Sequence, residues 1–219
     1  MQLFETQDGS HSLFSERFGV SYHSKYGAIQ ETRHVFIEAG LHYQLPTHPQ
    51  LSVLEMGFGT GLNALMTALA TSGRAQVYYE TIEAYPLNAA EAAQLNFGQL
   101  LPGEQAQQLL EQLHQSPWET DVQLASDFVL HKRQALLEDV TFTRAFDLVY
   151  YDAFAPGAQP ELWEHDMLRK IVEAMAPGGV FVTYCAKGAV KRSLKQLGLT
   201  VESPPGPPGK REMTRAIKG

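Results

Sequence analysis

Cysteine is almost absent from this 219-residue sequence, which contains only Cys185. A single cysteine cannot form a disulfide within the chain, and this is typical of proteins from a reducing compartment. The sequence also lacks any apolar run approaching the ~20 residues of a membrane-spanning helix. Residues 1–8 are acidic and have no apolar core, so they do not resemble a secretory signal. These absences exclude a disulfide-rich scaffold and a helical membrane span, and we expect a cytoplasmic protein.

Metal-binding and hydrolytic motifs are absent as well. The eight histidines show no metal-ligand spacing, so we expect no metal ion. No serine, histidine and aspartate residues follow one another in the order of a hydrolase triad, and no Walker loop is present.

The charge of the chain is uneven along its length. The formal net charge is -7, but the residues from Tyr184 onward carry eight Lys or Arg against two Glu. The remainder of the chain is therefore strongly acidic. A basic C-terminal segment on an acidic body predicts a phosphate-binding face, although a solvated helix and hairpin with no ligand explains the same charges.

Short apolar runs alternate with segments of helical periodicity from residue 46 onward. We expect strands at 51–56, 76–84, 122–130, 146–151 and 180–185, and helices at 62–70, 86–95, 105–114, 161–175 and 187–197. A Pro-Gly-Gly sequence at 177–179 should end the helix before it. Residues 199–202 and 213–217 can pair as a hairpin. The pattern predicts an α/β, Rossmann-like fold: a mostly parallel doubly wound sheet with a C-terminal antiparallel hairpin.

The first 45 residues do not join this alternation. They contain the segment Tyr22-His23-Ser24-Lys25-Tyr26-Gly27-Ala28 and then a helical pattern at 31–39. We expect the whole chain, residues 1–219, to be one domain, in which residues 1–45 form an extension over the ligand pocket of a core at 46–219. Tyr22 is then expected to contact the ligand.

Glycine occupies positions 57, 59 and 61, directly after the first core strand. The dinucleotide fingerprint G-x-G-x-x-G would need glycine at position 62, where Leu62 stands. Closely spaced glycines let the backbone approach a nucleoside. Glu55 can accept hydrogen bonds from the amino acid portion of a cationic ligand, directly or through water, but would repel a pyrophosphate. The turn therefore favours S-adenosylmethionine (SAM) bound by Glu55, Gly57, Gly59 and Gly61; the alternative is a turn needed only for tight packing.

Two further side chains extend this cofactor site. Glu83 follows the second core strand, where an acidic side chain can take both ribose hydroxyls. A single glutamate at a strand end is usually a surface residue with no ligand. The prediction that Glu83 binds ribose therefore depends on the glycine turn beside it. Asn63, near the start of the next helix, is expected to help hold the ligand's carboxylate.

The sequence Asp152-Ala153-Phe154-Ala155-Pro156 follows the strand at 146–151. In a parallel sheet the carboxyl end of a strand faces the ligand crevice, so Asp152 can reach a methyl-accepting nitrogen. Methyl transfer from a sulfonium needs a positioned nucleophile with a free lone pair. We expect Asp152 to be the catalytic residue, with Phe154 and Pro156 beside the acceptor; a helix cap or turn aspartate is the alternative.

Three ordered motifs resemble the MnmC-like methyltransferase family, which comprises the methyltransferase half of bifunctional MnmC and the stand-alone MnmD. They are E-M-G-F-G-T-G-L-N at 55–63, D-A-F-A-P-G-A-Q-P-E-L-W at 152–163 and P-G-P-P-G-K-R-E-M at 205–213. Residues 22–24 and 30–36 are also similar to that family's N-terminal segment. The resemblance implies SAM-dependent methylation of the aminomethyl group of 5-aminomethyl-(2-thio)uridine at the tRNA wobble position, which gives 5-methylaminomethyl-(2-thio)uridine.

The sequence departs from the family pattern in two places. It ends at Gly219, so we expect no FAD-dependent oxidase half, and aminomethyl-bearing tRNA is expected from upstream wobble-modifying enzymes. Such enzymes often place an aspartate near adenine after the third strand, where this chain has His131-Lys132-Arg133.

With this resemblance, the basic C-terminal segment is expected to bind the phosphates of the anticodon stem-loop. The expected substrate-binding residues are those of the segment and its proline-glycine loop: Lys187, Lys210, Arg211 and Glu212. Two alternatives stay open, a transferase acting on a small molecule such as a polyamine, and a catalytically silent subunit of the same fold that binds tRNA or a partner.

Overall fold

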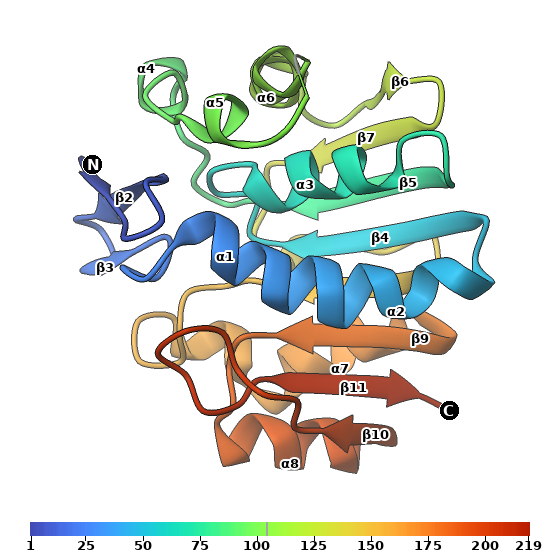
Figure 1. Ribbon diagram of the computed structural model, residues 1–219. Coiled ribbons are helices and arrows are strands. Elements are labelled where there is room, and N and C mark those ends of the chain that lie inside the picture. Colours follow the sequence, from blue (N-terminus) through green and yellow to red (C-terminus); the bar gives the residue numbers. More distant parts are fainter. Residues whose placement is uncertain (104) are drawn as a thin grey trace.

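The computed structural model of the protein describes residues 1–103 and 105–219. Within these residues, eight strands form the main sheet in the order β10-β11-β9-β8-β4-β5-β7-β6 (Figure 1). These strands are β4 (Gln50–Met56), β5 (Gln76–Ile82), β6 (Asp121–Ala125), β7 (Phe128–Arg133), β8 (Phe146–Tyr151), β9 (Met175–Thr183), β10 (Leu199–Glu202) and β11 (Thr214–Lys218).

The centre of the sheet is parallel and its edges are antiparallel. Strands β9, β8, β4, β5 and β7 run parallel to their neighbours, whereas β6 and the β10–β11 hairpin pair in the antiparallel sense. The chain moves from β4 to β5 in one direction and later returns to β8 on the other side of β4. Such a reversal of strand order opens a crevice at the carboxyl ends of the two strands. The predicted mostly parallel sheet with a C-terminal hairpin is confirmed.

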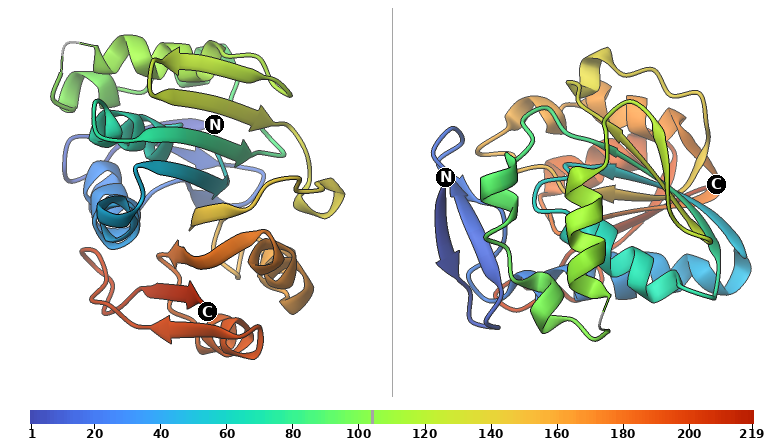
Figure 2. Two further views of the ribbon diagram at one scale, coloured as in Figure 1. Left: turned by 90° about the vertical axis from the view of Figure 1, so that its right-hand side faces the viewer. Right: turned by 90° about the horizontal axis from the view of Figure 1, so that it is seen from above.

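Helices cover both faces of this sheet, as the left view of Figure 2 shows. One face carries α1 (Ala28–Thr32), its continuation η1 (Arg33–Leu41) and α2 (His42–Gln44), together with α3 (Leu62–Thr71) and α6 (Ala106–Gln115). The other face carries α7 (His165–Glu173) and α8 (Gly188–Gln196). Each layer buries its own apolar cluster, one centred on Tyr79 and Tyr150 and the other on Tyr151 and Phe181. The shorter helices are η2 (Leu45–Thr47), α4 (Ala89–Ala92), α5 (Phe97–Leu100), η3 (Leu137–Asp139) and η4 (Pro160–Trp163).

The first 45 residues divide into two parts with different roles. Strands β1 (Gln2–Glu5), β2 (His11–Ser15) and β3 (Val20–Ser21) form a separate small sheet at the carboxyl ends of the parallel strands (Figure 1). The helix that follows instead packs on the main sheet, where Gly40 lies against the side chains of Val182 and Tyr150. The expected extension over the pocket is therefore limited to the small sheet, because the apolar side of the helix is buried in the core.

Three expected elements have different boundaries in the structure. The strand expected at 122–130 is the hairpin β6–β7, because the polar pair Ser126-Asp127 forms a turn. The helix expected at 86–95 is reduced to α4, which begins at Ala89 after the N-cap Asn88, and Asn88 forms a capping box with Glu91. Residues 177–179 do not precede β9 but lie within it, at a register shift. Among the described residues, no helix is both long and apolar enough to cross a membrane.

Candidate active site

The glycine turn follows β4 at the point where the strand order reverses. Gly57 has a φ of 92°, and a Cβ atom at this position would lie 2.9 Å from the backbone oxygen of Asp152. Its N–H donates to the oxygen of Ile82 at the end of β5, and the N–H of Asp152 donates to the oxygen of Met56. The turn is therefore tied to both neighbouring strands, and only glycine fits its first position without strain.

The rest of the turn is held by residues from the small N-terminal sheet and from α6. Gly59 packs against the Tyr22 ring, which a Cβ atom would approach to 3.0 Å. Thr60 is fixed on two sides: its hydroxyl lies 2.7 Å from Nε2 of His23 and its backbone oxygen 3.0 Å from Nε2 of His114. Burial lowers the pKa of each histidine to about 4, so both rings are neutral near pH 7.

A cavity of about 330 Å³ opens between this turn, the carboxyl ends of β5 and β8, and the N-terminal sheet. Seven of the expected site residues line it: Tyr22, Gly57, Gly59, Asn63, Glu83, Asp152 and Phe154. The other expected residues lie outside it, namely Glu55, Gly61, Pro156, Lys187, Lys210, Arg211 and Glu212.

Glu83 enters the cavity just after β5 with its carboxylate held in place by the backbone. Its two oxygens accept hydrogen bonds from the N–H groups of Gly59, at 3.0 Å, and Tyr85, at 2.8 Å. A carboxylate has about four lone-pair positions, so each oxygen can accept a further hydrogen bond from a ribose hydroxyl. Burial raises the pKa of Glu83, whereas these backbone hydrogen bonds oppose the rise.

The residues beyond β7 give the cavity an apolar end. Leu136 and Leu137 line it there, and they suit the flat surface of a nucleobase. The segment 131–133, where the family pattern suggested an adenine contact, faces elsewhere. His131 pairs with Asp121, the Lys132 ammonium donates to the carbonyl oxygens of Leu113 and His114, and Arg133 pairs with Glu80. The residues that line the cavity at this end lie further along the chain, at Leu136, Leu137 and Glu138.

Glu55 differs most from its sequence expectation. Side chains alternate along β4, so Met56 faces the cavity side while Glu55 points into the layer of α3. Its side chain is fully buried, and neither carboxylate oxygen has a hydrogen-bond partner among the described residues. Burial and the nearby charge of Asp152 raise the pKa of Glu55 well above its usual range. Glu55 therefore lies behind the turn, and contact with a ligand would require water or rearrangement.

Asp152 stands at the carboxyl end of β8, on the cavity wall opposite Glu83. Its Oδ2 accepts a hydrogen bond of 2.8 Å from the amide nitrogen of Asn63 on α3. The amide oxygen of Asn63 accepts one of 3.0 Å from the Thr32 hydroxyl on α1. Asn63 thus orients Asp152. Burial raises the pKa of Asp152 to about 8, and the charge of Glu31 adds to the rise, whereas Asn63 and Lys210 oppose it.

Aromatic rings close the acceptor side of the cavity. Phe154 packs against Phe18 and Tyr22, with ring centroids 4.9 and 5.0 Å apart, so the N-terminal sheet and the segment after β8 meet over the opening. Pro156 is half-buried outside the cavity. Phe154 therefore lines the opening of the cavity, whereas Pro156 belongs to the turn behind it.

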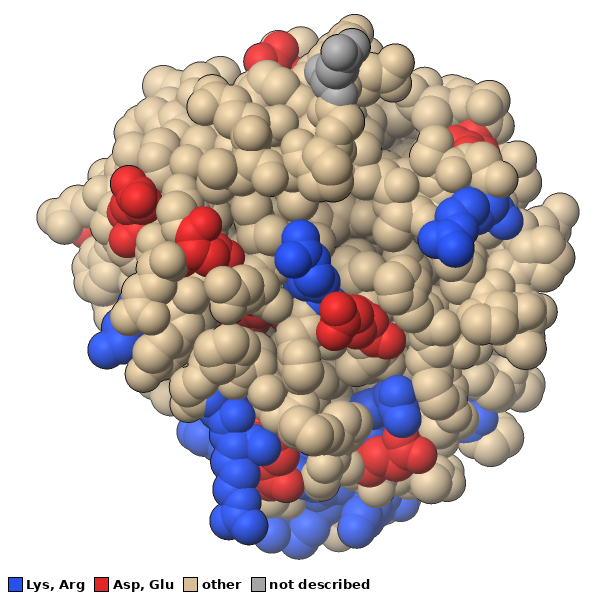
Figure 3. All heavy atoms as spheres, in the orientation of Figure 1, with Lys and Arg blue, Asp and Glu red and all other residues tan. Residues whose placement is uncertain are grey.

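The expected substrate-binding residues fall into two groups. Lys187 and Arg211 are exposed, and Figure 3 shows Lys and Arg side chains gathered at the lower end of the molecule, over α8 and the C-terminal strands. Lys210 and Glu212 are engaged in ion pairs instead. Lys210 pairs with Glu31 at 2.6 Å and Glu212 with Lys191 at 2.8 Å. Lys210 is therefore directed at Glu31 on α1, outside the cavity, in this structure.

Sequence reasoning missed four residues that line the cavity, Phe18, His23, Leu136 and Leu137. It also missed two residues outside the cavity, His114, which holds Thr60, and Glu31, which pairs with Lys210. His23 and Glu31 lie in the N-terminal segments that carried the family resemblance, which was the available signal for them. No local pattern marks the others. Among residues 1–103 and 105–219, no three His, Cys, Asp or Glu side chains are grouped so as to hold a metal ion.

The donor side of the cavity fits SAM. A glycine backbone that a Cβ would obstruct borders one wall, a carboxylate with free lone pairs lies at the ribose position, and apolar side chains line the base position. None of these features provides the positive charge that a pyrophosphate needs. The expected SAM-binding residues Gly57, Gly59 and Glu83 border this space directly.

Comparisons with known proteins agree with this fit. A family model described as S-adenosyl-L-methionine-dependent methyltransferase matches residues 102–219. The chain is 31% identical to the tRNA 5-methylaminomethyl-2-thiouridine biosynthesis bifunctional protein MnmC of Acinetobacter baylyi, over 96% of this chain and 36% of that protein. It is 32% identical to the protein of the same name from Delftia acidovorans, over 93% of this chain and 33% of that protein.

A solved structure, MnmC2 from Aquifex aeolicus, is similar in fold with a TM-score of 0.78 and 25% identity, over 98% of this chain and 69% of that chain. The chain spans about a third of the length of the curated relatives it matches. These matches confirm the resemblance to the MnmC-like methyltransferases. Because the family model matches more than half of the chain, the protein belongs to this family of S-adenosyl-L-methionine-dependent methyltransferases, and S-adenosyl-L-methionine is its cofactor.

Proposed function

We propose that the protein transfers a methyl group to the aminomethyl nitrogen of 5-aminomethyl-(2-thio)uridine at the wobble position of tRNA. The product would be 5-methylaminomethyl-(2-thio)uridine, the nucleoside in the name of the curated relatives. The observation that carries this proposal is Asp152, an acidic side chain of raised pKa on the cavity wall facing the cofactor positions. A tRNA substrate would put the reaction in the cytoplasm.

SAM, when bound, supplies a methyl group on a positively charged sulfur, which is already activated for in-line displacement. The chain's own residues then have two tasks. Glu83 and the turn at Gly57 and Gly59 hold the donor, and we propose that Asn63 contributes through its position between the turn and Asp152. Phe154, Phe18 and Tyr22 exclude water from the side where the acceptor enters.

Asp152 deals with the proton of the acceptor. A primary alkylamine is mostly an ammonium near pH 7, and its lone pair must be freed before it can form the new N–C bond. A carboxylate whose pKa is about 8 is far better matched to this proton than an ordinary aspartate would be. Asn63 keeps Oδ2 of Asp152 in place and leaves Oδ1 for the amine.

The exposed basic residues over α8 fit the polyanionic part of this substrate. Lys187, Arg192, Lys195 and Arg211 are exposed. Figure 3 shows Lys and Arg side chains gathered at the lower end of the molecule, over α8 and the C-terminal strands. We propose that they contact phosphates of the anticodon stem-loop, while the loop between β10 and β11 lies near the target uridine. Glu212 would act indirectly, by holding Lys191.

The test is incubation of the purified protein with labelled SAM and tRNA carrying aminomethyluridine, in parallel with polyamines as acceptors. Label in a wobble methylaminomethyl nucleoside supports the proposal. Label in the polyamine alone would identify a small-molecule transferase. Binding of SAM and tRNA with no transfer to either acceptor would indicate a silent subunit.

Asp152→Ala tests the assignment of the proton acceptor. We expect turnover to fall at least ~10-fold, since general acid–base catalysis typically contributes about 10²–10⁴-fold, while SAM affinity changes little. Near-normal turnover would remove Asp152 from the reaction. Calorimetric SAM binding serves as the folding control.

A further inference from the structure

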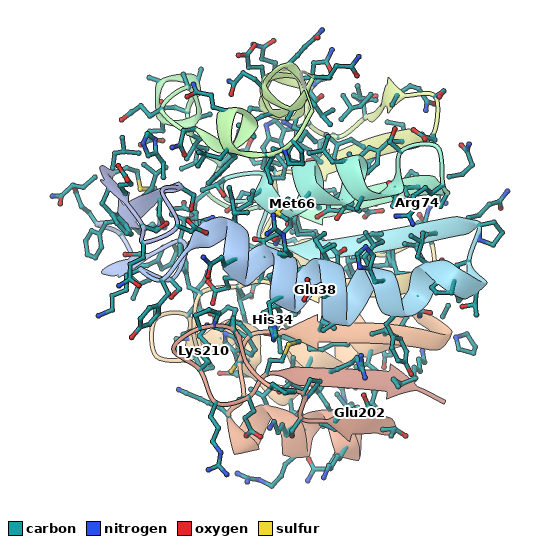
Figure 4. All side chains as sticks on the ribbon, in the orientation of Figure 1. His34, Glu38, Met66, Arg74, Glu202 and Lys210 are labelled. Carbon is teal, nitrogen blue, oxygen red and sulfur yellow. The ribbon has the colours of Figure 1, made fainter. Side chains whose placement is uncertain are left out.

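The loop between β10 and β11, residues 203–213, is docked onto the N-terminal helix rather than free at the surface. The Lys210 ammonium lies 2.6 Å from Oε1 of Glu31 on α1, and Figure 4 shows Lys210 beside this helix. Gly209 packs on the Tyr26 ring, and Nε2 of His34 lies 2.7 Å from the oxygen of Pro205. Three contacts thus fix the loop to the N-terminal segment, at Tyr26, Glu31 and His34.

Glu31 is nearly buried and is built into this contact from both sides. Its Oε2 accepts a hydrogen bond from the N–H of Ser24, so the carboxylate is held between the N-terminal segment and the loop. The next residue, Thr32, donates to Asn63, which in turn donates to Asp152. One turn of helix therefore connects the loop to the carboxyl group that we assign as proton acceptor.

The Lys210 ammonium is surrounded by acidic and aromatic side chains. It lies over the Tyr184 ring, 3.9 Å from the centroid, and the Tyr184 hydroxyl donates to the oxygen of Ala153, next to Asp152. The titratable groups that face Asp152 come from five elements: Glu31 from α1, Glu55 from β4, Tyr79 from β5, Tyr184 after β9 and Lys210 from the loop. Among these, Lys210 brings the positive charge.

We propose that Lys210 and Glu31 form a positioning pair for Asp152, through which the docked 203–213 loop sets how readily Asp152 takes the proton of the acceptor amine. The functional consequence rests on the proposed function, since it concerns the acceptor site. Arg211, the neighbour of Lys210, is exposed, so an RNA contact with this loop would act on the same pair. Binding of the substrate and the readiness of the base would thereby be coupled.

The two charges act on Asp152 in opposite directions. The Lys210 ammonium stabilises the Asp152 carboxylate, whereas the Glu31 carboxylate destabilises it. Lys210→Met should therefore raise the midpoint of the Asp152 titration and Glu31→Gln should lower it, each by about half a pH unit or more. The double variant should fall between the two. Lys210→Arg keeps the charge and should stay close to wild type.

The readout is the carboxyl carbon signal of Asp152 in protein labelled with ¹³C-aspartate, followed by NMR as a function of pH without SAM or tRNA. Asp152→Asn identifies the signal. The midpoint of the pH–rate profile of methyl transfer provides the second readout and should move in the same direction. If no tRNA is methylated, the proposed function fails, but the NMR titration still decides on the pair.

A second ion pair serves as a control. It distinguishes an effect of the Lys210–Glu31 charges on the titration of Asp152 from an effect of attaching the hairpin to the N-terminal helix. Arg215 on β11 pairs with Glu202 at 2.7 Å and donates to the oxygen of Ala39, so it also ties the C-terminal hairpin to the N-terminal helix. Arg215→Met and Glu202→Gln should loosen the hairpin without moving the Asp152 titration. Equal shifts in both sets of variants, or no shift in Lys210→Met while thermal unfolding shows it to be folded, would overturn the proposal.

Discussion

Replacing Asp152 with asparagine should make the stability of the protein less dependent on pH. The asparagine side chain has the same shape, and its oxygen can still accept the hydrogen bond from Asn63. What it removes is a carboxyl group that burial keeps protonated in the folded state up to a pKa of about 8, against an ordinary value of 3.8. The variant therefore isolates the electrostatic cost of this one group.

The sign and size of the effect follow from proton linkage. The folded state binds the Asp152 proton more tightly than the unfolded chain, so between pH 3.8 and about 8 each rise in pH lowers the free energy of unfolding. One pH unit corresponds to about 1.4 kcal/mol per group. When the pH rises from about 5.5 to about 8.5, ionisation of Asp152 should lower the free energy of unfolding of wild type by about 2 kcal/mol. This value includes a reduction for the partial exposure of Asp152 to the cavity.

Urea unfolding of wild type and Asp152→Asn at these two pH values measures the difference directly. Wild type should lose more stability than the variant, and at the higher pH the variant should be the more stable protein although its methyl transfer is impaired. Parallel loss of stability in both proteins would refute the assignment of a raised pKa to Asp152. A variant less stable at both values by the same amount would show a packing defect instead.

The other predictions concern the donor site, the N-terminal sheet and the basic face. Gly57→Ala should destabilise the protein by about 3 kcal/mol, because it combines a left-handed φ with a clash against the Asp152 backbone, whereas Gly73→Ala, with a φ of 67° and open space, should cost about 1 kcal/mol in the same urea assay. Glu83→Ala should weaken SAM binding at least ~10-fold in calorimetry, since it removes charge-assisted hydrogen bonds, and Glu83→Gln should retain part of the affinity. Stability should fall as the pH drops from 6.5 towards about 4, where the unfolded chain protonates histidine but buried His23 stays neutral, and His23→Gln should make this fall shallower in thermal unfolding. Lys187→Ala with Arg211→Ala should raise the apparent KM for tRNA without changing SAM affinity, and weaker SAM binding would argue against a phosphate role.

The central fold was predictable because its signals are local. The strand before Gly57 and the helix after Leu62 differ clearly in apolar period, and the same is true of β8 and α8. Prediction failed where a few polar residues decide the outcome. The turn at Ser126-Asp127 divides one apparent strand into two, and the N-cap Asn88 makes α4 begin at Ala89 rather than at Pro86.

The helix that includes Arg33–Leu41 shows a different reason for failure. Its position on the sheet depends on contact of Gly40 with Val182, a residue more than 140 positions away. Periodicity indicates a helix there but not the surface that it covers, because tertiary packing decides that. The assignment of residues 1–45 to one extension therefore joined a cavity-covering sheet to a core helix.

The sequence predicted the residues expected to bind SAM from a short region, whereas it did not predict the arrangement of the residues around Asp152. Gly57, Gly59 and Glu83 lie within two consecutive strand ends, so spacing alone brings them together. Glu55 shares that motif but faces the other side of β4, which strand alternation could have indicated. The sequence did not show that the Lys210 side chain points inward to Glu31, because these two residues are 179 positions apart. The positive charge of the C-terminal segment instead suggested that Lys210 binds phosphates of the tRNA.

The acidic residues of the site, Glu31, Glu55 and Asp152, come from segments that are far apart in the sequence, and electrostatic repulsion explains why. Glu31, Glu55 and Asp152 would repel one another if charged together in a buried space, and a local sequence with three such carboxyls would stay in water. Separate elements can bring them in one at a time, with Asn63 beside Asp152 and Lys210 beside Glu31. Burial raises the pKa of Glu55 well above its usual range, Glu31 is paired with Lys210, and the pKa of Asp152 is raised to about 8. If the proposed function is right, Asp152 is the group of this cluster that is placed to exchange a proton with the amine.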